Sequence, residues 1–174
     1  RMSDRTSFYP ELARTISPAD GRLGVLIPGL GAVATTLVAG VHLIGKGLAR
    51  PVGSLTQMQK LRLGKRTAPR FVSIPELVPL AKLPDLVFGG WDIFPDDAYQ
   101  TALKAGVVPK EMLAAVQDEL SALQPWPAVF DRQYVKRLDG PNVKKGPHKL
   151  DLANQVVADI RRFKNKDAFA RHNG

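Results

Sequence analysis

The stretch over residues 23–45 carries no charged side chain, and it constrains the fold more than any other part of the sequence. It is as long as the roughly 20 residues that a membrane-spanning helix needs. Its first half, however, contains Gly24, Pro28, Gly29 and Gly31, and these residue types favour turns over a continuous helix. We therefore expect two short elements joined by a turn, and neither a membrane span nor a secretory signal.

The order of elements can be predicted from the apolar runs and the turn formers. Residues 23–27 are a short apolar run with β-branched members, which predicts a buried parallel strand, and an apolar helix follows from Ala32 to about Leu48. A second strand is predicted over residues 83–88, ending at Gly89-Gly90, with Trp91-Asp92 just past its carboxyl end. Further along the chain we expect a helix over 98–104 capped by Asp97, a helix from Pro109 to about Leu123, a short strand over 128–130, a loop over 138–147 and a last helix over 149–164, whose buried stripe would be Leu152, Val156, Ile160 and Phe163.

This alternation of strands and helices predicts an α/β fold with a Rossmann-like, doubly wound parallel sheet. Residues 1–22 mix charges with Ser, Thr and Pro, so we expect an amino-terminal arm there and one dinucleotide-binding domain over residues 23–174.

The chain is basic, with 25 Lys and Arg against 16 Asp and Glu and a formal net charge of +9. Most of the excess lies in the acid-free region over residues 21–75, which is predicted to form long loops around one short element near residues 61–63. This charge favours an anionic partner, although a solvated basic surface explains it equally well. The absence of cysteine excludes disulfides and thiol chemistry, and it is compatible with a cytoplasmic location.

The turn after the first predicted strand is the motif that carries chemistry. Gly29-Leu30-Gly31-Ala32-Val33-Ala34 matches the G-x-G-x-x-A fingerprint of dinucleotide-binding folds. Small residues there permit a tight turn and let a pyrophosphate approach the backbone, where the amides at the helix start would hold it. The expected strand before the turn and helix after it strengthen the match, because the glycine pattern alone is a weak signal.

One part of the fingerprint is missing. The acidic residue that holds the adenosine ribose is expected about 20 residues after the turn, and the acid-free region has none. Taken alone this favours NADP, with Lys46 or Arg50 meeting the 2′-phosphate. Asp92 is the alternative acid if its strand lies beside the first one, so the choice between NAD and NADP stays open at this point.

No catalytic or metal-binding constellation can be assembled from the sequence. We interpret His42, on the apolar helix, as a core histidine, whereas His148 and His172 lack metal-ligand spacing. Asp96-Asp97 are more simply explained as helix-capping residues than as an acid pair.

Four segments together resemble the bacterial form of the myo-inositol-1-phosphate synthase family. In chain order they are Leu30-Gly31-Ala32-Val33-Ala34-Thr35-Thr36, Gly53-Ser54-Leu55-Thr56-Gln57-Met58, Leu86-Val87-Phe88-Gly89-Gly90-Trp91-Asp92-Ile93 and Arg137-Leu138-Asp139-Gly140-Pro141-Asn142. The resemblance implies NAD as the cofactor. It also implies a set of residues that hold NAD: Gly29, Leu30, Gly31, Ala32 and Val33 at the pyrophosphate, Asp92 at the ribose, and Ala128 and Asp139 near the adenosine end.

The resemblance further implies an isomerase of inositol and phospholipid biosynthesis, which converts glucose 6-phosphate to myo-inositol phosphate by oxidation at C5, enolisation, aldol cyclisation and reduction by the same NAD. By this resemblance the complete enzyme is a cytoplasmic homotetramer, and its catalytic lysines come from a downstream domain. This chain would then hold only an incomplete Rossmann-like domain with no catalytic residue. We expect it to be inactive alone. Two rival functions are another NAD(P)-dependent oxidoreductase, which would release NADH in each turnover, and a noncatalytic module that binds a polyanion through residues 46–70. We expect contact with neither membrane nor nucleic acid.

Overall fold

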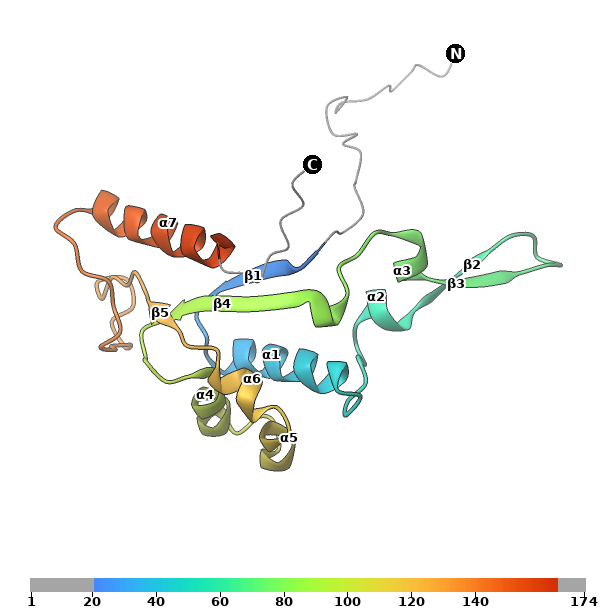
Figure 1. Cartoon of the computed structure of the whole chain (residues 1–174), viewed down its shortest axis with the longest axis horizontal. Coiled ribbons are helices and arrows are strands. Elements are labelled where there is room, and N and C mark those ends of the chain that lie inside the picture. The colour runs from blue at the N-terminus through green and yellow to red at the C-terminus, as the bar shows by residue number, and fades with distance from the viewer. Residues whose placement is uncertain (1–20, 166–174) are drawn as a thin grey trace, which may run out of the picture.

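The computed structural model describes residues 21–165, so nearly all of the predicted arm over residues 1–22 lies outside the described part. Figure 1 shows a small sheet with helices on both of its faces. In chain order the elements are β1 (Leu23–Pro28), α1 (Ala32–Gly45), α2 (Leu55–Met58), β2 (Lys60–Leu63), β3 (Arg70–Ser73), α3 (Ile74–Leu77), the 3-10 turn η1 (Leu83–Asp85), β4 (Leu86–Asp92), α4 (Ala98–Ala105), α5 (Lys110–Ala114), α6 (Gln117–Ser121), β5 (Trp126–Pro127) and α7 (Lys149–Asn165).

The main sheet consists of β1, β4 and β5 in this spatial order, and both pairs of neighbours are parallel. β1 pairs with β4 along its whole length, from Leu23 opposite Leu86 to Pro28 opposite Trp91. α1 and α4–α6 lie on one side of the sheet and α7 on the other (Figure 1). The predicted α/β class with a parallel, doubly wound sheet is confirmed, and the carboxyl ends of β1 and β4 lie side by side.

The predicted boundaries of β4 were wrong at both ends. Residues 83–85 form the 3-10 turn, and the strand runs through Gly89 and Gly90 to Asp92 instead of ending at the two glycines. Packing explains the glycines: a Cβ on Gly90 would lie 2.2 Å from the carbonyl oxygen of Ile27, and a Cβ on Gly89 would lie 2.9 Å from the ring of Phe163. The glycine pair therefore lets β1 and α7 approach β4 closely.

The uncharged stretch over residues 23–45 forms the two predicted elements, β1 and α1, joined by the glycine turn. α1 ends at Gly45, before the predicted Leu48, and Gly47 follows with a φ of 72° that glycine adopts without strain. Within residues 21–165, no helix is both long and apolar enough to cross a membrane. The core lies between α1 and α4–α6 and is made by Leu30, Ala34, Val38, Ala39, Leu43, Ala98, Ala102, Leu113, Val116, Leu120 and Leu123.

The single helix predicted from Pro109 to Leu123 was wrong, because the structure has two short helices, α5 and α6. The break lies at Val116, which has φ −127° and ψ 24° and is completely buried. Packing of this side chain into the core thus overrides the local helical pattern. The short strand predicted over 128–130 was also misplaced: β5 covers Trp126–Pro127, and Ala128 forms only an isolated parallel bridge with Val143.

The acid-free region forms more regular structure than predicted. The expected short element is β2, which pairs antiparallel with β3, and the short helices α2 and α3 flank this hairpin. Figure 1 shows the hairpin projecting away from the main sheet. Its cations are all exposed: Lys60, Arg62, Lys65, Arg66 and Arg70.

The last predicted helix is confirmed as α7, but its buried face differs from the predicted apolar stripe. Phe163 is buried and Val156 half-buried, whereas Ile160 is 41% exposed and its neighbour Asp159 only 2% exposed. Asp159 is tolerated there because it accepts a hydrogen bond from Nε1 of Trp91 at 2.8 Å and pairs with Lys144 at 2.6 Å. The hydrogen bond from Trp91 joins α7 to β4, and the ion pair joins α7 to the loop that precedes it.

Candidate functional site

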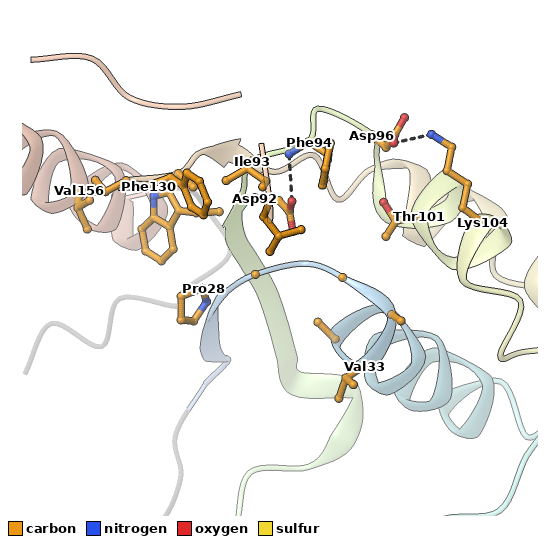
Figure 2. A pocket seen from close by; sticks show the side chains of 18 residues that line it. Pro28, Val33, Asp92, Ile93, Phe94, Asp96, Thr101, Lys104, Phe130 and Val156 are labelled. Atoms are coloured by element: carbon orange, nitrogen blue, oxygen red, sulfur yellow. Dashed lines mark hydrogen bonds and ion pairs between the residues drawn. The ribbon is translucent and has the colours of Figure 1, made fainter. Parts of the chain in front are cut away.

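A cleft of about 940 Å³ opens where β1 and β4 end. In open α/β sheets, ligands bind in the crevice outside the carboxyl ends of the strands, so the cleft lies where the fold class places a ligand. Figure 2 shows residues from the glycine turn, the end of β4, α4 and α7 around it. The lining comprises Pro28, Gly29, Gly31, Ala32, Val33, Ala34, Trp91, Asp92, Ile93, Phe94, Asp96, Thr101, Lys104, Ala128, Val129, Phe130, Leu138 and Val156.

The glycine turn leaves open space above its backbone. Gly29 has φ 106°, a conformation that other residues adopt only with strain, and its amide donates a hydrogen bond to the Trp91 carbonyl at 2.8 Å. Gly31 has φ −79°, which any residue can adopt, yet a Cβ on either glycine would meet no atom within 4 Å. The turn is therefore fixed to β4 while its outer side stays free for a ligand.

The amino terminus of α1 faces this space and carries no anion of its own. Gly31 is the N-cap and offers no side-chain cap, and the first turn contains no acidic residue. The amides of Ala32, Val33 and Ala34 have no acceptor four residues earlier in the helix, so they and the helix dipole favour a bound anion. This arrangement suits a pyrophosphate.

Two residues of the predicted pyrophosphate segment have side chains in opposite environments. Leu30 is 2% exposed and belongs to the core, so only its main chain is available to a ligand. Val33 is 86% exposed and lies at the rim of the cleft, at the start of α1 (Figure 2).

Asp92 is the last residue of β4, and the in-register pairing of β4 with β1 brings it beside the glycine turn. One carboxylate oxygen accepts a hydrogen bond from the Phe94 amide at 3.0 Å, and its main-chain carbonyl accepts one from Nδ2 of Asn142 at 2.9 Å. Asp92 therefore occupies the place of the fingerprint acid at the end of the strand next to the first one. Asp92 lies much further along the chain than the expected 20 residues, because the hairpin and its flanking helices lie between α1 and β4.

The opposite end of the cleft is apolar. Phe130 and Val156 lie there, on the side away from Lys104 (Figure 2), and Ala128, Val129 and Leu138 also line the cleft. Such a wall suits the flat faces of an adenine base.

The structure does not bring Asp139 into the cleft lining. Its exposed carboxylate pairs with Arg132 at 3.0 Å. The adjacent Gly140 approaches β4 closely, because a Cβ there would lie 2.3 Å from the Ile93 carbonyl oxygen.

Neither cation suggested for a 2′-phosphate lines the cleft. Lys46 lies at the far end of α1, about 20 Å from the glycine turn for a helix of this length. It pairs there with Glu119 at 2.7 Å and donates to the Ala115 carbonyl. Arg50 is not among the lining residues either.

His42 lies outside the lining as well, and burial lowers its pKa from the usual value, in spite of the nearby Glu119 carboxylate. Its ring packs edge-on against Phe88 with the centroids 6.2 Å apart. Within residues 21–165, no group of three or more His, Asp or Glu side chains is placed to hold a metal.

Sequence reasoning did not single out Thr101 or Lys104 and interpreted Asp96 only as a helix-capping residue, although all three line the cleft. Thr101 and Lys104 are three residues apart on α4 and so share a face, but only the tertiary structure turns that face towards Asp92. Asn142 belongs to the last of the four segments that resemble the family, but no role was predicted for it. Its side chain donates a hydrogen bond to the Asp92 carbonyl.

The residues present fit a dinucleotide cofactor. Open backbone space and free helix amides suit the pyrophosphate, a carboxylate at the next strand suits ribose hydroxyls, and the apolar wall suits the adenine.

The comparisons with known proteins agree on one family of enzymes. The family model described as myo-inositol-1-phosphate synthase, an NAD-binding domain, matches residues 23–172. An inositol-3-phosphate synthase of Bacteroides thetaiotaomicron is 46% identical over 154 residues, covering 88% of this chain and 35% of that protein. One of Oryza sativa is 31% identical over 160 residues, covering 83% of this chain and 31% of that protein.

A solved structure shares the fold. The inositol-3-phosphate synthase of Caenorhabditis elegans superposes with a TM-score of 0.74 at 24% identity, covering 83% of this chain and 32% of that chain. The chain thus spans about a third of the length of the relatives it matches.

Proposed function

The chain belongs to the myo-inositol-1-phosphate synthase family, and from this premise we propose that it forms the NAD-binding part of an inositol-3-phosphate synthase. The observation that carries the proposal is the meeting of the glycine turn and Asp92 in one cleft at the carboxyl ends of two adjacent parallel strands. A fingerprint turn with an acid at the neighbouring strand end is the arrangement by which α/β folds hold dinucleotides.

Each part of the cleft has a separate role in this proposal. The backbone of residues 29–33, Leu30 included, holds the pyrophosphate through its amides and the α1 dipole. Asp92 accepts hydrogen bonds from the ribose hydroxyls. Ala128 and its apolar neighbours cover the adenine. Asp139 lies outside the cleft lining, paired with Arg132, and its proposed place is near the adenosine end of the cofactor.

The reaction proposed for the whole enzyme is the isomerisation of glucose 6-phosphate to myo-inositol phosphate. Bound NAD would supply the hydride chemistry of this reaction, as acceptor of the C5 hydride and as its donor later in the same turnover. The described residues bind and orient the cofactor, while the remaining two thirds of a relative's length would supply the catalytic lysines. The tetrameric assembly and the cytoplasmic location belong to the same proposal.

Calorimetric titration of NAD into the purified protein tests the binding role. We expect saturable binding, and we expect Asp92→Asn to weaken it by about ten-fold or more, the value of a charge-assisted hydrogen bond. Asparagine keeps an oxygen for the Phe94 amide, so folding should be retained. Asp118→Asn removes an exposed carboxylate outside the cleft and should bind NAD as the original protein does. Equal NAD affinity in all three proteins would contradict the assignment of Asp92.

The isomerase activity is tested with a polypeptide of the full family length and glucose 6-phosphate deuterated at C5. We expect inositol phosphate that retains the deuterium, with no net formation of NADH. Steady accumulation of NADH would favour the rival oxidoreductase, because that reaction needs an external acceptor.

A further inference from the structure

One buried carboxylate joins three segments of the chain behind the apolar end of the cleft. Asp159 lies on α7 and is 2% exposed. Its Oδ2 accepts a hydrogen bond from Nε1 of Trp91 at 2.8 Å and pairs with Nζ of Lys144 at 2.6 Å. Its Oδ1 pairs with Arg162 at 2.6 Å. Both oxygens are therefore occupied by the protein itself, so Asp159 is not placed to bind a ligand directly.

Each segment that Asp159 joins contributes a residue to the cleft lining. Trp91, at the end of β4, lines the cleft itself. The amide of Lys144 donates to the carbonyl of Ala128 at 2.8 Å, and Ala128 lines the cleft. Val156 lines it from α7 (Figure 2), three residues before Asp159 and so on the same side of the helix. The carboxylate thus holds three parts of one wall at a single point.

Stability alone gives little reason for a charge at this position. Trp91 packs edge-on against Trp126 with the ring centroids 5.3 Å apart, and Trp126 packs in the same way against Phe163 at 5.7 Å. Apolar residues could therefore hold α7 on the sheet, and replacing a buried ion pair by apolar residues of similar volume is often neutral or stabilising. Apolar contacts are non-directional, whereas hydrogen bonds to a carboxylate have a preferred geometry. Asp159 therefore adds orientation to the packing of this wall.

Building on the proposed NAD role, we propose that Asp159 is a positioning residue for the adenosine half of the cofactor. It does not touch the cofactor but fixes Trp91, Ala128 and Val156 relative to one another before the adenine enters. A site that is ordered in advance binds more tightly, because binding then orders fewer groups. Without the Asp159 charge the ammonium of Lys144, only 7% exposed, has lost its counter-ion and moves towards water, and Ala128 loses its fixed neighbour.

The test compares the NAD affinity of two destabilised variants, at a temperature at which circular dichroism shows each protein to be folded. Asp159→Asn should weaken NAD binding about ten-fold, the upper end of the effect of ordering one side chain on binding. ADP, which has the adenosine and the pyrophosphate but no nicotinamide, should lose affinity by the same factor. Leu113→Ala is the matched control, because it empties part of the core outside the cleft lining. It should lower the unfolding temperature and bind both ligands as the original protein does.

Trp91→Phe is the second variant, and it decides alone if Asp159→Asn does not fold. It keeps a ring at the cleft and the ion pairs of Asp159 but removes the Nε1 donor, so it should weaken NAD and ADP binding about three-fold or more. The proposal is overturned if the folded variants bind NAD as the original protein does, if Leu113→Ala loses as much affinity, or if NAD binding weakens while ADP binding does not. Failure of the original protein to bind NAD would instead overturn the proposed function, and this inference with it.

Discussion

The two glycines of the turn are needed for different reasons, although they look equivalent in the sequence. Gly29 needs its residue type for conformation, because its φ is 106°. Gly31 has an ordinary φ of −79° and open space at its Cβ position. We therefore expect the lack of a Cβ at Gly31 to be needed for the proposed ligand and not for the fold.

A pair of alanine substitutions separates these roles. Gly29→Ala should destabilise the fold by roughly 1–3 kcal/mol, the cost of an unfavourable backbone conformation. Gly31→Ala should unfold at nearly the original temperature but lose NAD affinity, because its methyl group fills the space in which the pyrophosphate meets the backbone. Thermal unfolding and NAD titration of both variants provide the measurements. Full NAD affinity of the Gly31→Ala variant would contradict the proposed position of the pyrophosphate at this turn.

Residue patterns predicted the core of the site but not its outer wall. The glycine turn and Asp92 were found because each follows an apolar run that ends at the same sheet edge. Lys104 and Asp96 gave no such signal, since an ion pair along a helix is usually a solvated surface feature.

At the scale of elements, close approach to β4 explains most differences from the prediction. Gly89 and Gly90 suggested a turn, yet they lie inside the strand because β1 and α7 leave no room for a Cβ. Local propensity cannot reveal this, as the crowding comes from segments far away in the chain. The parallel strands and the last helix were predictable because their apolar patterns are local.

The attachment of α7 to the sheet gives a prediction about stability. Asp159→Asn should cost about 3 kcal/mol, because it leaves the ammonium of Lys144, only 7% exposed, without its counter-ion. Replacing both residues, Asp159→Asn with Lys144→Met, should recover part of the loss. Denaturant unfolding followed by tryptophan fluorescence measures both, since Trp91 donates to Asp159. Equal stability of Asp159→Asn and the original protein would show that the buried pair contributes nothing.

The packing of α1 gives a prediction about pH. Burial lowers the pKa of His42 below its usual value of about 6.5, so the unfolded chain takes up this proton more readily than the folded one. The stability linked to His42 is therefore fully present above about pH 6.5 and is lost as the pH falls through the lower folded value. His42→Gln should flatten this part of the profile.

The titration of Glu119 lies outside the pH range of that experiment. The hydrogen bond from Lys46 lowers the pKa of Glu119, so its contribution is lost only at a more acidic pH, below the usual range of a carboxylate. Urea unfolding of the original protein and of His42→Gln between pH 5 and 7 should diverge; parallel curves would contradict the buried state of His42.

At the scale of the whole molecule, the exposed positive charge of the hairpin and the candidate cofactor cleft lie in different places. The β2–β3 hairpin, whose cations are exposed, projects away from the main sheet (Figure 1). The cleft is lined by residues at the carboxyl ends of β1 and β4. The basic composition therefore gave no guide to the cleft, which contains more carboxylates than ammonium groups. Family membership, expected from four short segments, is confirmed by a match that covers residues 23–172.

A structure of the protein with NAD bound tests the central claim most directly. The account predicts the pyrophosphate against the backbone of residues 29–33 and the α1 amino terminus, with ribose hydroxyls within hydrogen-bond distance of Asp92. The adenine should lie between Ala128 and Val156. NAD bound on the basic hairpin, or in the cleft with its pyrophosphate away from the glycine turn, would contradict it.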